Sequence, residues 1–290
     1  MKVLVTGCNG QLGHEMRNIL EKEMPGKTIY TDINELDLTD GDAVKSFVEK
    51  NEITHIVNCA AYTAVDRAEE DKALCHQINV DAVRNLANAA SATGAKVVHI
   101  STDYVFDGKA YRPYSESDKV NPMSHYGTTK RQGETALIAL APDSVIVRTA
   151  WLYSPYGNNF VKTMIRLGRE RKELRVVVDQ IGSPTYAADL AAAVYKIIES
   201  HQWVPGIYHF TNSGVASWYD FTKAIHRIAG VTDCKVIPIP TEDYPTAASR
   251  PFYSVLNTHR LRTTYNVEIP YWVDSLEKCI ARLKEEESNN

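Results

Sequence analysis

A glycine-rich turn near the start of the chain constrains the fold more than any other feature. The run Thr6-Gly-Cys-Asn-Gly-Gln-Leu-Gly13 spaces its glycines as G-x-x-G-x-x-G, between a short apolar run and a helical stretch. Gly7 allows a tight turn, Gly10 a close approach to a pyrophosphate, and Gly13 close packing of helix on strand. The helix N-terminus that follows offers free N–H groups to the phosphates. This arrangement predicts a dinucleotide site formed by Gly7, Asn9, Gly10, Gln11, Leu12 and Gly13.

Apolar strands alternate with helical stretches through the first half of the chain. Strands are predicted at 3–5, 28–31, 54–58, 97–100 and 144–147, with a short additional one ending at 37–38. Helices are predicted at 11–23, 41–51, 71–93 and 126–140. Such alternation requires right-handed crossovers, so the fold class is α/β, a Rossmann-type doubly wound parallel sheet.

Beyond about residue 150 the predicted elements become shorter, and glycine and proline interrupt them often. We therefore expect a dinucleotide-binding Rossmann domain at 1–150. Residues 151–290 are expected to form mainly a smaller C-terminal substrate-binding lobe, with some elements returning to the Rossmann core.

Composition narrows the class of protein. Of the 290 residues 44% are hydrophobic and 23% charged, and the net charge is -4, which gives no basic footprint for nucleic acid or a membrane surface. No apolar stretch approaches the roughly 18 residues of a membrane span, and no secretory signal is visible. The five cysteines are scattered, which is typical of reduced thiols. We expect a cytoplasmic protein with no nucleic-acid or membrane partner.

Three further segments are candidates for the cofactor site. Asp32 ends the second predicted strand, where an acid accepts hydrogen bonds from ribose hydroxyls and favours NAD over NADP. The alternative is an ordinary loop aspartate, and the choice between NADH and NADPH stays open. Asp37 and Leu38 are expected near an adenine. After the strand at 54–58, the run beside the cofactor comprises Ala60, Ala61, Tyr62 and Thr63.

A Tyr-x-x-x-Lys spacing occurs twice, as Tyr126/Lys130 and Tyr219/Lys223. On a helix this spacing puts both side chains on one face. An ammonium near a phenol lowers the tyrosine pKa from its usual value of about 10. Such a tyrosine can protonate a carbonyl oxygen as hydride reaches the carbon. Chance alone could nearly supply these matches, so the spacing by itself is weak evidence.

Position in the fold distinguishes the two pairs. Tyr126 follows Ser101-Thr102, two hydroxyl residues at the carboxyl end of a predicted strand, where ligands of open α/β sheets bind. The later pair lacks such a strand-end hydroxyl, and its helix is expected to point Phe221 inward instead. We therefore assign Thr102, Tyr126 and Lys130 as the catalytic residues.

Longer motifs are more distinctive than the glycines or the Tyr/Lys pair. They are NCAAYTAVD at 58–66, STDYVFDG at 101–108, YGTTK at 126–130, RTAWLY at 148–153, DQIGSPT at 179–185, SWYDF at 217–221 and Arg250-Pro251. Through them the whole chain resembles the extended short-chain dehydrogenase/reductase family and, within it, the dTDP-4-dehydrorhamnose reductases.

The resemblance implies a reaction that spacing alone does not reveal. The C4 keto group of dTDP-4-dehydro-6-deoxy-L-mannose would be reduced with NADPH or NADH to give dTDP-L-rhamnose. Tyr126 would protonate the C4 oxygen, Lys130 would hold the nicotinamide ribose and tune Tyr126, and Thr102 would polarise the carbonyl. The substrate-binding residues implied are Val65, Thr102, Asp103, Tyr104, Tyr126, Trp151 and Arg250. Core packing for Trp151 and a surface cation for Arg250 are the alternatives.

Metal binding and assembly are less determined by the resemblance. Some relatives bind Mg²⁺ through acidic residues at a dimer interface. Glu15 matches one such position, but Asp189 stands where glutamate is usual. We assign no metal site and leave Mg²⁺ and a homodimer as open alternatives. The segment around Arg250 also departs from the family, with Phe252-Tyr253 replacing small polar residues.

Two rival functions follow from the same resemblance. A nucleotide-sugar 4-epimerase or 4,6-dehydratase would retain its cofactor through the cycle, and a dehydratase places Asp-Glu after the strand-end threonine. Here Asp103-Tyr104 follows Thr102, which argues against dehydration. The other rival is a non-catalytic regulator like the regulatory subunit of methionine adenosyltransferase, against which the intact Tyr126 and Lys130 argue.

Overall fold

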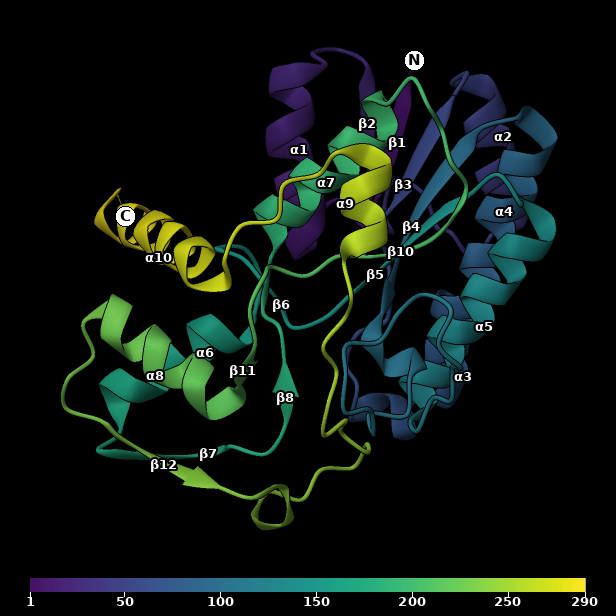
Figure 1. Ribbon diagram of the computed structural model, residues 1–290. Coiled ribbons are helices and arrows are strands. Elements are labelled where there is room, and N and C mark those ends of the chain that lie inside the picture. Colours follow the sequence, from purple (N-terminus) through teal and green to yellow (C-terminus); the bar gives the residue numbers. More distant parts are fainter. Residues whose placement is uncertain (290) are drawn as a thin grey trace.

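A six-stranded parallel sheet organises the computed structural model, which describes residues 1–289 (Figure 1). Its strands, in the spatial order β10-β5-β4-β3-β1-β2, are Gly206–His209, Val145–Thr149, Lys96–Thr102, His55–Asn58, Val3–Thr6 and Thr28–Thr31. Every neighbouring pair is parallel. The predicted Rossmann-type α/β sheet is confirmed.

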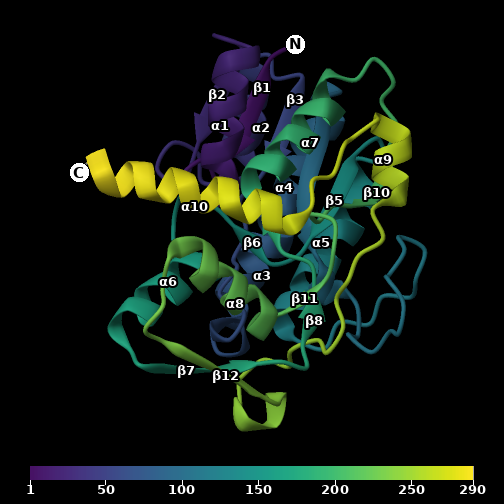
Figure 2. The same cartoon turned by 60° about the vertical axis from the view of Figure 1, so that its left-hand side comes forward.

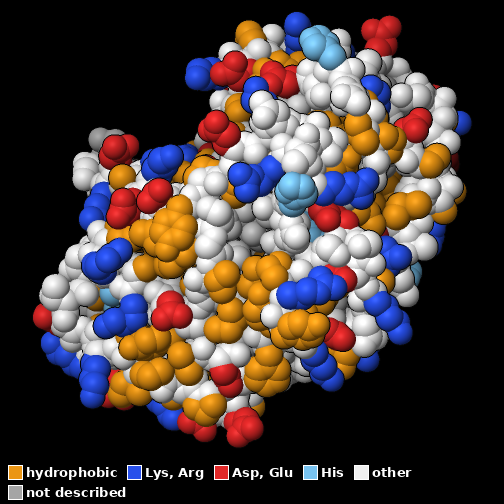
Figure 3. All heavy atoms as spheres, viewed as in Figure 1, with side chains coloured by type: hydrophobic (Ala, Val, Ile, Leu, Met, Phe, Trp, Pro, Cys, Tyr) orange, Lys and Arg blue, Asp and Glu red, His pale blue; other side chains and the backbone are white. Residues whose placement is uncertain are grey.

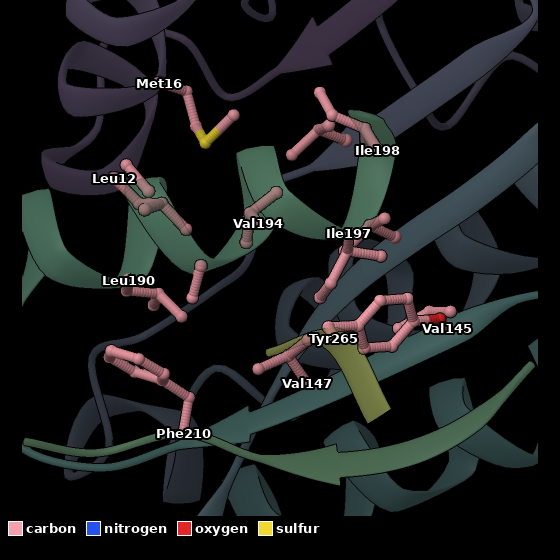
Figure 4. Packing of buried hydrophobic residues seen from close by; sticks show 14 of the residues in the cluster. Leu12, Met16, Val145, Val147, Leu190, Val194, Ile197, Ile198, Phe210 and Tyr265 are labelled. Atoms are coloured by element: carbon pink, nitrogen blue, oxygen red, sulfur yellow. The ribbon is translucent and has the colours of Figure 1, made fainter. Parts of the chain in front are cut away.

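Helices cover both faces of the sheet because strand side chains alternate between two cores. On β1, Val3 and Val5 face α1 (Gln11–Glu23) and α7 (Ala187–Glu199), whereas Leu4 faces α2 (Gly41–Lys50), α4 (Ala82–Thr93) and α5 (His125–Leu140). Figure 4 shows the first core, where Leu12 and Met16 of α1 approach α7. This burial removes apolar side chains from water at about 2 kcal/mol each.

The helix predicted at 71–93 is helical throughout but contains a wider turn. α3 (Lys72–His76) continues through a π-helical turn, Gln77–Asp81, into α4. The buried Asn79 within that turn accepts the backbone N–H of Tyr62 (2.9 Å) and donates to its carbonyl (3.1 Å). These bonds attach the helix to the segment that follows β3.

The short strand predicted to end at Asp37-Leu38 is wrong. Asp37 lies in a turn, where its Oδ1 accepts hydrogen bonds from the N–H (2.9 Å) and hydroxyl (2.7 Å) of Thr39. Leu38 packs against the core beneath α2. The backbone is therefore satisfied locally and the segment has no need of a sheet partner.

The later part of the chain contributes both to the large sheet and to a separate lobe. Its β10 is the edge strand of the large sheet, and α7 and α9 (His259–Tyr265) pack against that sheet. Other elements form a lobe below it: β6 (Leu152–Tyr153), α6 (Phe160–Glu170), β7 (Glu173–Val177), β8 (Ile181–Gly182), β9 (Thr185–Tyr186), β11 (Ala216–Ser217), α8 (Trp218–Ala229) and β12 (Lys235–Ile239). Figure 2 shows α10 (Trp272–Asn289) running across the junction between lobe and sheet.

Short 3₁₀ turns complete the described elements, at Arg67–Glu69, Asp103–Val105 and Thr241–Asp243. Within residues 1–289, no helix combines the length and apolar character that a membrane span needs.

Candidate active site

A cleft of about 610 Å³ lies where the carboxyl ends of the central strands meet the lower lobe. It brings together many of the predicted residues: Gly10, Gln11, Leu12, Ala61, Thr63, Val65, Thr102, Asp103, Tyr104, Tyr126, Lys130, Trp151 and Arg250. Other predicted residues belong to the described chain but do not line it: Gly7, Asn9, Gly13, Asp32, Asp37, Leu38, Ala60 and Tyr62. Figure 3 shows apolar side chains on the surface near this junction. The exposed Phe252 and the partly buried Tyr253 also lie outside the cleft lining.

The glycine turn has little room for side chains except toward the cleft. Gly7 has a φ of 64°, and a Cβ there would lie 2.7 Å from the backbone of Ala60. A Cβ on Gly13 would lie 2.3 Å from the carbonyl oxygen of Gly7. Gly10, in contrast, lines the cleft and caps α1 without a side-chain hydrogen bond. The first N–H groups of α1 can therefore receive a phosphate.

Asp32 is held beside the glycine turn. Its Oδ2 accepts the backbone N–H of Asn9 (3.0 Å) and its Oδ1 accepts that of Ile33 (2.9 Å). The carboxylate thus links the end of β2 to the turn that follows β1. This position, close to the turn but outside the cleft lining, fits an acid that meets a ribose at the far end of a dinucleotide.

Tyr126 lies in the first turn of α5, which begins after the N-cap Ser124 accepts the N–H of Gly127 (3.1 Å). The phenol is buried against Thr102, the last residue of β4. Burial raises the pKa of Tyr126 above its ordinary value, and a hydrogen bond with Thr102 offsets this only in part. The phenol is therefore protonated at neutral pH, which is the form that can give a proton to a carbonyl oxygen.

Lys130 lies one helical turn beyond Tyr126 and is 2% exposed. Its Nζ donates to the carbonyl of Ile100 (2.8 Å) and lies 3.4 Å from Nε2 of His99. Burial lowers the pKa of Lys130 to about 8, although the nearby Glu134 carboxylate favours the charged amine. The lysine is thus close to its titration midpoint at mildly alkaline pH.

Two tryptophans form the wall of the cleft in the lower lobe. Trp151 stacks on Trp218 with ring centroids 3.5 Å apart and planes 10° apart. Trp151 has a φ of 50°, which is rare for a bulky residue and costs roughly 1–3 kcal/mol. Gly182 accommodates the stack, since a Cβ there would lie 2.7 Å from the Trp151 ring. Trp151 therefore packs against the core of the lower lobe and also lines the cleft, and its strained backbone is typical of a functional position.

Arg250 joins the lower lobe to the sheet across the cleft. Its Nη1 donates to the hydroxyl of Tyr104 (2.9 Å) and its Nη2 forms an ion pair with Asp66. The guanidinium is therefore no free surface cation. Next to it, burial raises the pKa of Asp103 to about 6, while a hydrogen bond from Thr102 (3.0 Å) favours the carboxylate.

Several residues of the site were missed in the sequence. Asn159, the N-cap of α6, donates to the side chain of Gln11 (3.0 Å) and so connects the lower lobe to the glycine turn. Trp218 belongs to the SWYDF motif at 217–221, and nothing in that motif indicates that its indole lines the cleft. His99 contacts Lys130 from β4, two residues before Ser101, and its strand-end neighbours were the available signal.

The second Tyr-x-x-x-Lys pair lies elsewhere. Lys223 is exposed, Tyr219 is half-buried, and neither lines the cleft. Phe221 is fully buried in the core of the lower lobe, as predicted.

The acidic positions considered for Mg²⁺ do not fit a metal. Glu15 accepts a hydrogen bond from Arg282 (2.7 Å), so a fixed cation already neutralises it. Asp189 accepts hydrogen bonds from Asn212 (2.6 Å) and Ser275 (2.5 Å). Across residues 1–289, no cluster of three or more His, Cys, Asp or Glu side chains could hold an ion.

Comparisons with known proteins agree over nearly the whole chain. The profile of the family described as RmlD substrate binding domain matches residues 1–285. The dTDP-4-dehydrorhamnose reductase of Aggregatibacter actinomycetemcomitans is 40% identical, covering 97% of this chain and 98% of that protein. A crystal structure of a dTDP-4-dehydrorhamnose reductase from Clostridium acetobutylicum is 48% identical with a TM-score of 0.94, covering 98% of this chain and all of that one. The Bacillus anthracis enzyme, solved in complex with NADP, is 43% identical with a TM-score of 0.92, at coverages of 97% and 100%.

Proposed function

We propose that this chain, which belongs to the RmlD substrate binding domain family, is a dTDP-4-dehydrorhamnose reductase. It reduces the C4 keto group of dTDP-4-dehydro-6-deoxy-L-mannose with NADPH or NADH and yields dTDP-L-rhamnose. The observation that carries the proposal is the cleft that combines the glycine turn with Thr102, Tyr126 and Lys130.

The chemistry divides between cofactor and protein. The nicotinamide supplies hydride to C4 when it is bound. Tyr126 gives its proton to the C4 oxygen. Thr102 turns its hydroxyl from Asp103 to the substrate and donates a hydrogen bond that orients the carbonyl. Lys130 holds the nicotinamide ribose and favours the phenolate left behind by proton transfer. All three side chains are largely buried where they line the cleft, which limits the contact of the reacting atoms with water.

Binding is assigned to the two halves of the chain. Residues 1–150 form the dinucleotide domain, with the pyrophosphate on the turn that contains Gly10 and a ribose near Asp32. Residues 151–290 form mainly the substrate lobe, where Trp151 flanks the hexose. Arg250 meets the nucleotide phosphates by exchanging its contact with Asp66, since a guanidinium binds phosphate and carboxylate in the same way. The remaining assigned residues are Val65, Asp103 and Tyr104 on the sugar side, and Ala60, Ala61, Tyr62 and Thr63 beside the cofactor. All five cysteines are free thiols, which supports a cytoplasmic location.

Stoichiometry tests the proposal and separates it from its rivals. Purified protein, NADPH or NADH and the 4-keto sugar nucleotide should give one oxidised cofactor per dTDP-L-rhamnose formed. An epimerase or dehydratase would convert sugar without net oxidation of cofactor, and a regulator would convert none. Absence of oxidation with either cofactor would contradict the reductase function.

Metal removal gives an independent check on the site. Because Arg282 already neutralises Glu15, we expect prior treatment with EDTA to leave the rate unchanged. A rate that falls with EDTA and returns with Mg²⁺ would show that a metal ion contributes to activity despite the ion pair between Arg282 and Glu15.

A further inference from the structure

A buried polar chain runs beneath the candidate active site. Thr6 Oγ1 donates to Asn58 Oδ1 (2.7 Å), and Asn58 Nδ2 lies 3.0 Å from Nδ1 of His99. The chain ends at Lys130, whose Nζ is 3.4 Å from Nε2 of the same imidazole. Thr6 faces Asn58, and Asn58 faces His99, in the parallel register of β1, β3 and β4. The register of the sheet therefore fixes the positions of these polar side chains relative to one another.

The contacts determine which ring nitrogen of His99 carries the proton. Asn58 Oδ1 also accepts the backbone N–H of Ala60 (3.1 Å), so the amide oxygen must face that way. Its Nδ2 can then only donate, and Nδ1 of His99 must accept. Burial, helped by the nearby Lys130 ammonium, lowers the pKa of His99 well below its ordinary value. The imidazole is neutral, with its proton on Nε2.

This tautomer points an N–H at the amine of Lys130. An ammonium has only donors, whereas a neutral amine has a lone pair that can accept Nε2–H. The carbonyl of Ile100 accepts a proton from Nζ in either form. Glu134 and Cys75, the other titratable groups that act on this lysine, both favour the charged form. His99 therefore opposes them.

We propose that His99 is a positioning residue for Lys130: held by Asn58, it donates Nε2–H to the amine and keeps the neutral form accessible during turnover. The inference rests on the proposed function, in which Tyr126 loses a proton in each cycle. The Lys130 ammonium then gives up a proton that restores the Tyr126 phenol. The neutral amine formed in this way takes a proton from solvent. A lysine held only as ammonium could not complete this exchange.

The first test is direct and needs no variant to be active. In protein labelled with ¹⁵N-histidine, long-range proton–nitrogen correlations show which ring nitrogen is protonated, and the His99 signals are those lost in His99→Phe. We expect a neutral ring with its proton on Nε2 near pH 7. A proton on Nδ1, or a charged ring, overturns the proposal.

The second test measures the titration of Lys130 through its ¹³Cε signal, assigned by its loss in Lys130→Met. Loss of the hydrogen bond to the neutral amine should raise the midpoint in His99→Phe by about one pH unit, a tenfold change in the equilibrium. The matched control is His209→Phe, an equally buried histidine on β10 whose Nδ1 lies 3.1 Å from the Tyr114 carbonyl. An unchanged midpoint in His99→Phe, or an equal rise in both variants, contradicts the proposal.

Asn58→Asp provides a second test if His99→Phe does not fold. An aspartate can only accept from Nδ1, so the ¹⁵N spectrum should show the proton of His99 moved from Nε2 to Nδ1; a proton that stays on Nε2 contradicts the proposal. These titrations use the protein without sugar nucleotide. Failure of the proposed function would appear instead as a wild-type protein that oxidises no cofactor, whatever the titrations show.

Discussion

Two helices carry the same Tyr-x-x-x-Lys spacing in different surroundings. On α5, Tyr126 and Lys130 are 8% and 2% exposed and lie at the carboxyl end of β4. On α8, Tyr219 is half-buried and Lys223 points into solvent, in a lobe whose strands are short. Identical spacing therefore leads to a buried tyrosine–lysine pair in one region and an ordinary amphipathic face in the other.

Packing against the lobe's core accounts for most of α8 but not for α5. Ser217 and Asp220 form a capping box, and Phe221 and Ile225 face the core of the lobe, as expected of a helix stabilised by its apolar side. α5 instead buries Lys130, whose amine costs free energy to remove from water. Its buried neighbour Glu134 is accounted for by an ion pair with Arg148 (2.8 Å), whereas Lys130 has no carboxylate of residues 1–289 within ion-pair distance. The burial of this lysine indicates where the protein gives up stability for chemistry.

The largest expected effect distinguishes the two tyrosines. Tyr126→Phe removes the proposed acid and should lower kcat by roughly 10²–10⁴. Tyr219→Phe, the matched change on α8, should leave kcat unchanged. Both are measured as NADPH oxidation with the 4-keto sugar nucleotide. A large fall in kcat in Tyr219→Phe would mean that the proton donor lies on α8 and that its assignment to α5 is wrong.

Replacing each of the two lysines should affect stability differently. At Lys130 the replacement should raise stability although it lowers activity. Lys130→Met removes a buried cation and should raise the free energy of unfolding by about 1–3 kcal/mol near pH 7 while lowering activity. Lys223→Met should change stability by less than about 0.5 kcal/mol. Urea unfolding of each variant measures the difference.

The effect of Lys130→Met on the free energy of unfolding should depend on pH, in a direction set by the pKa of Lys130. Because the folded pKa of Lys130 is lowered to about 8 from 10.5, the cost is fully present below pH 8 and is relieved as pH rises toward 10.5. The advantage of Lys130→Met over wild type should shrink across this window. An advantage that is constant with pH would mean that packing, rather than charge, is responsible.

The comparison also shows how far sequence reasoning reaches. The glycine turn and the strand-end position of Thr102 could be predicted because each depends on residues close together in the chain. The same applies to the helix that carries Tyr126. The short strand at Asp37-Leu38 failed for a local reason too, since hydrogen bonds from Thr39 satisfy the backbone as a turn.

Contacts between residues far apart in the chain could not be predicted from the sequence. The π-helical turn at 77–81 is associated with the bonds of Asn79 to the Tyr62 backbone, and no periodicity indicates it. The ion pair of Arg250 with Asp66 joins residues 184 positions apart. The cleft's aromatic wall likewise arises only when the segment between β5 and β6 meets the start of α8, so its second tryptophan could not be foreseen from spacing.

The smallest expected effect sharpens the comparison, because α8 does contribute one side chain to the cleft. Trp218 stacks on Trp151, and such a pair is worth roughly 0.5–1.5 kcal/mol. Trp218→Ala should therefore raise KM for the sugar nucleotide up to about tenfold, with kcat and the KM for NADPH little changed. Trp203→Ala, whose indole instead donates to the Asp143 carbonyl (2.6 Å) outside the cleft, serves as the control. A fall in kcat in Trp218→Ala without a change in KM would mean that α8 acts on the chemical step, and the contrast between the helices would fail.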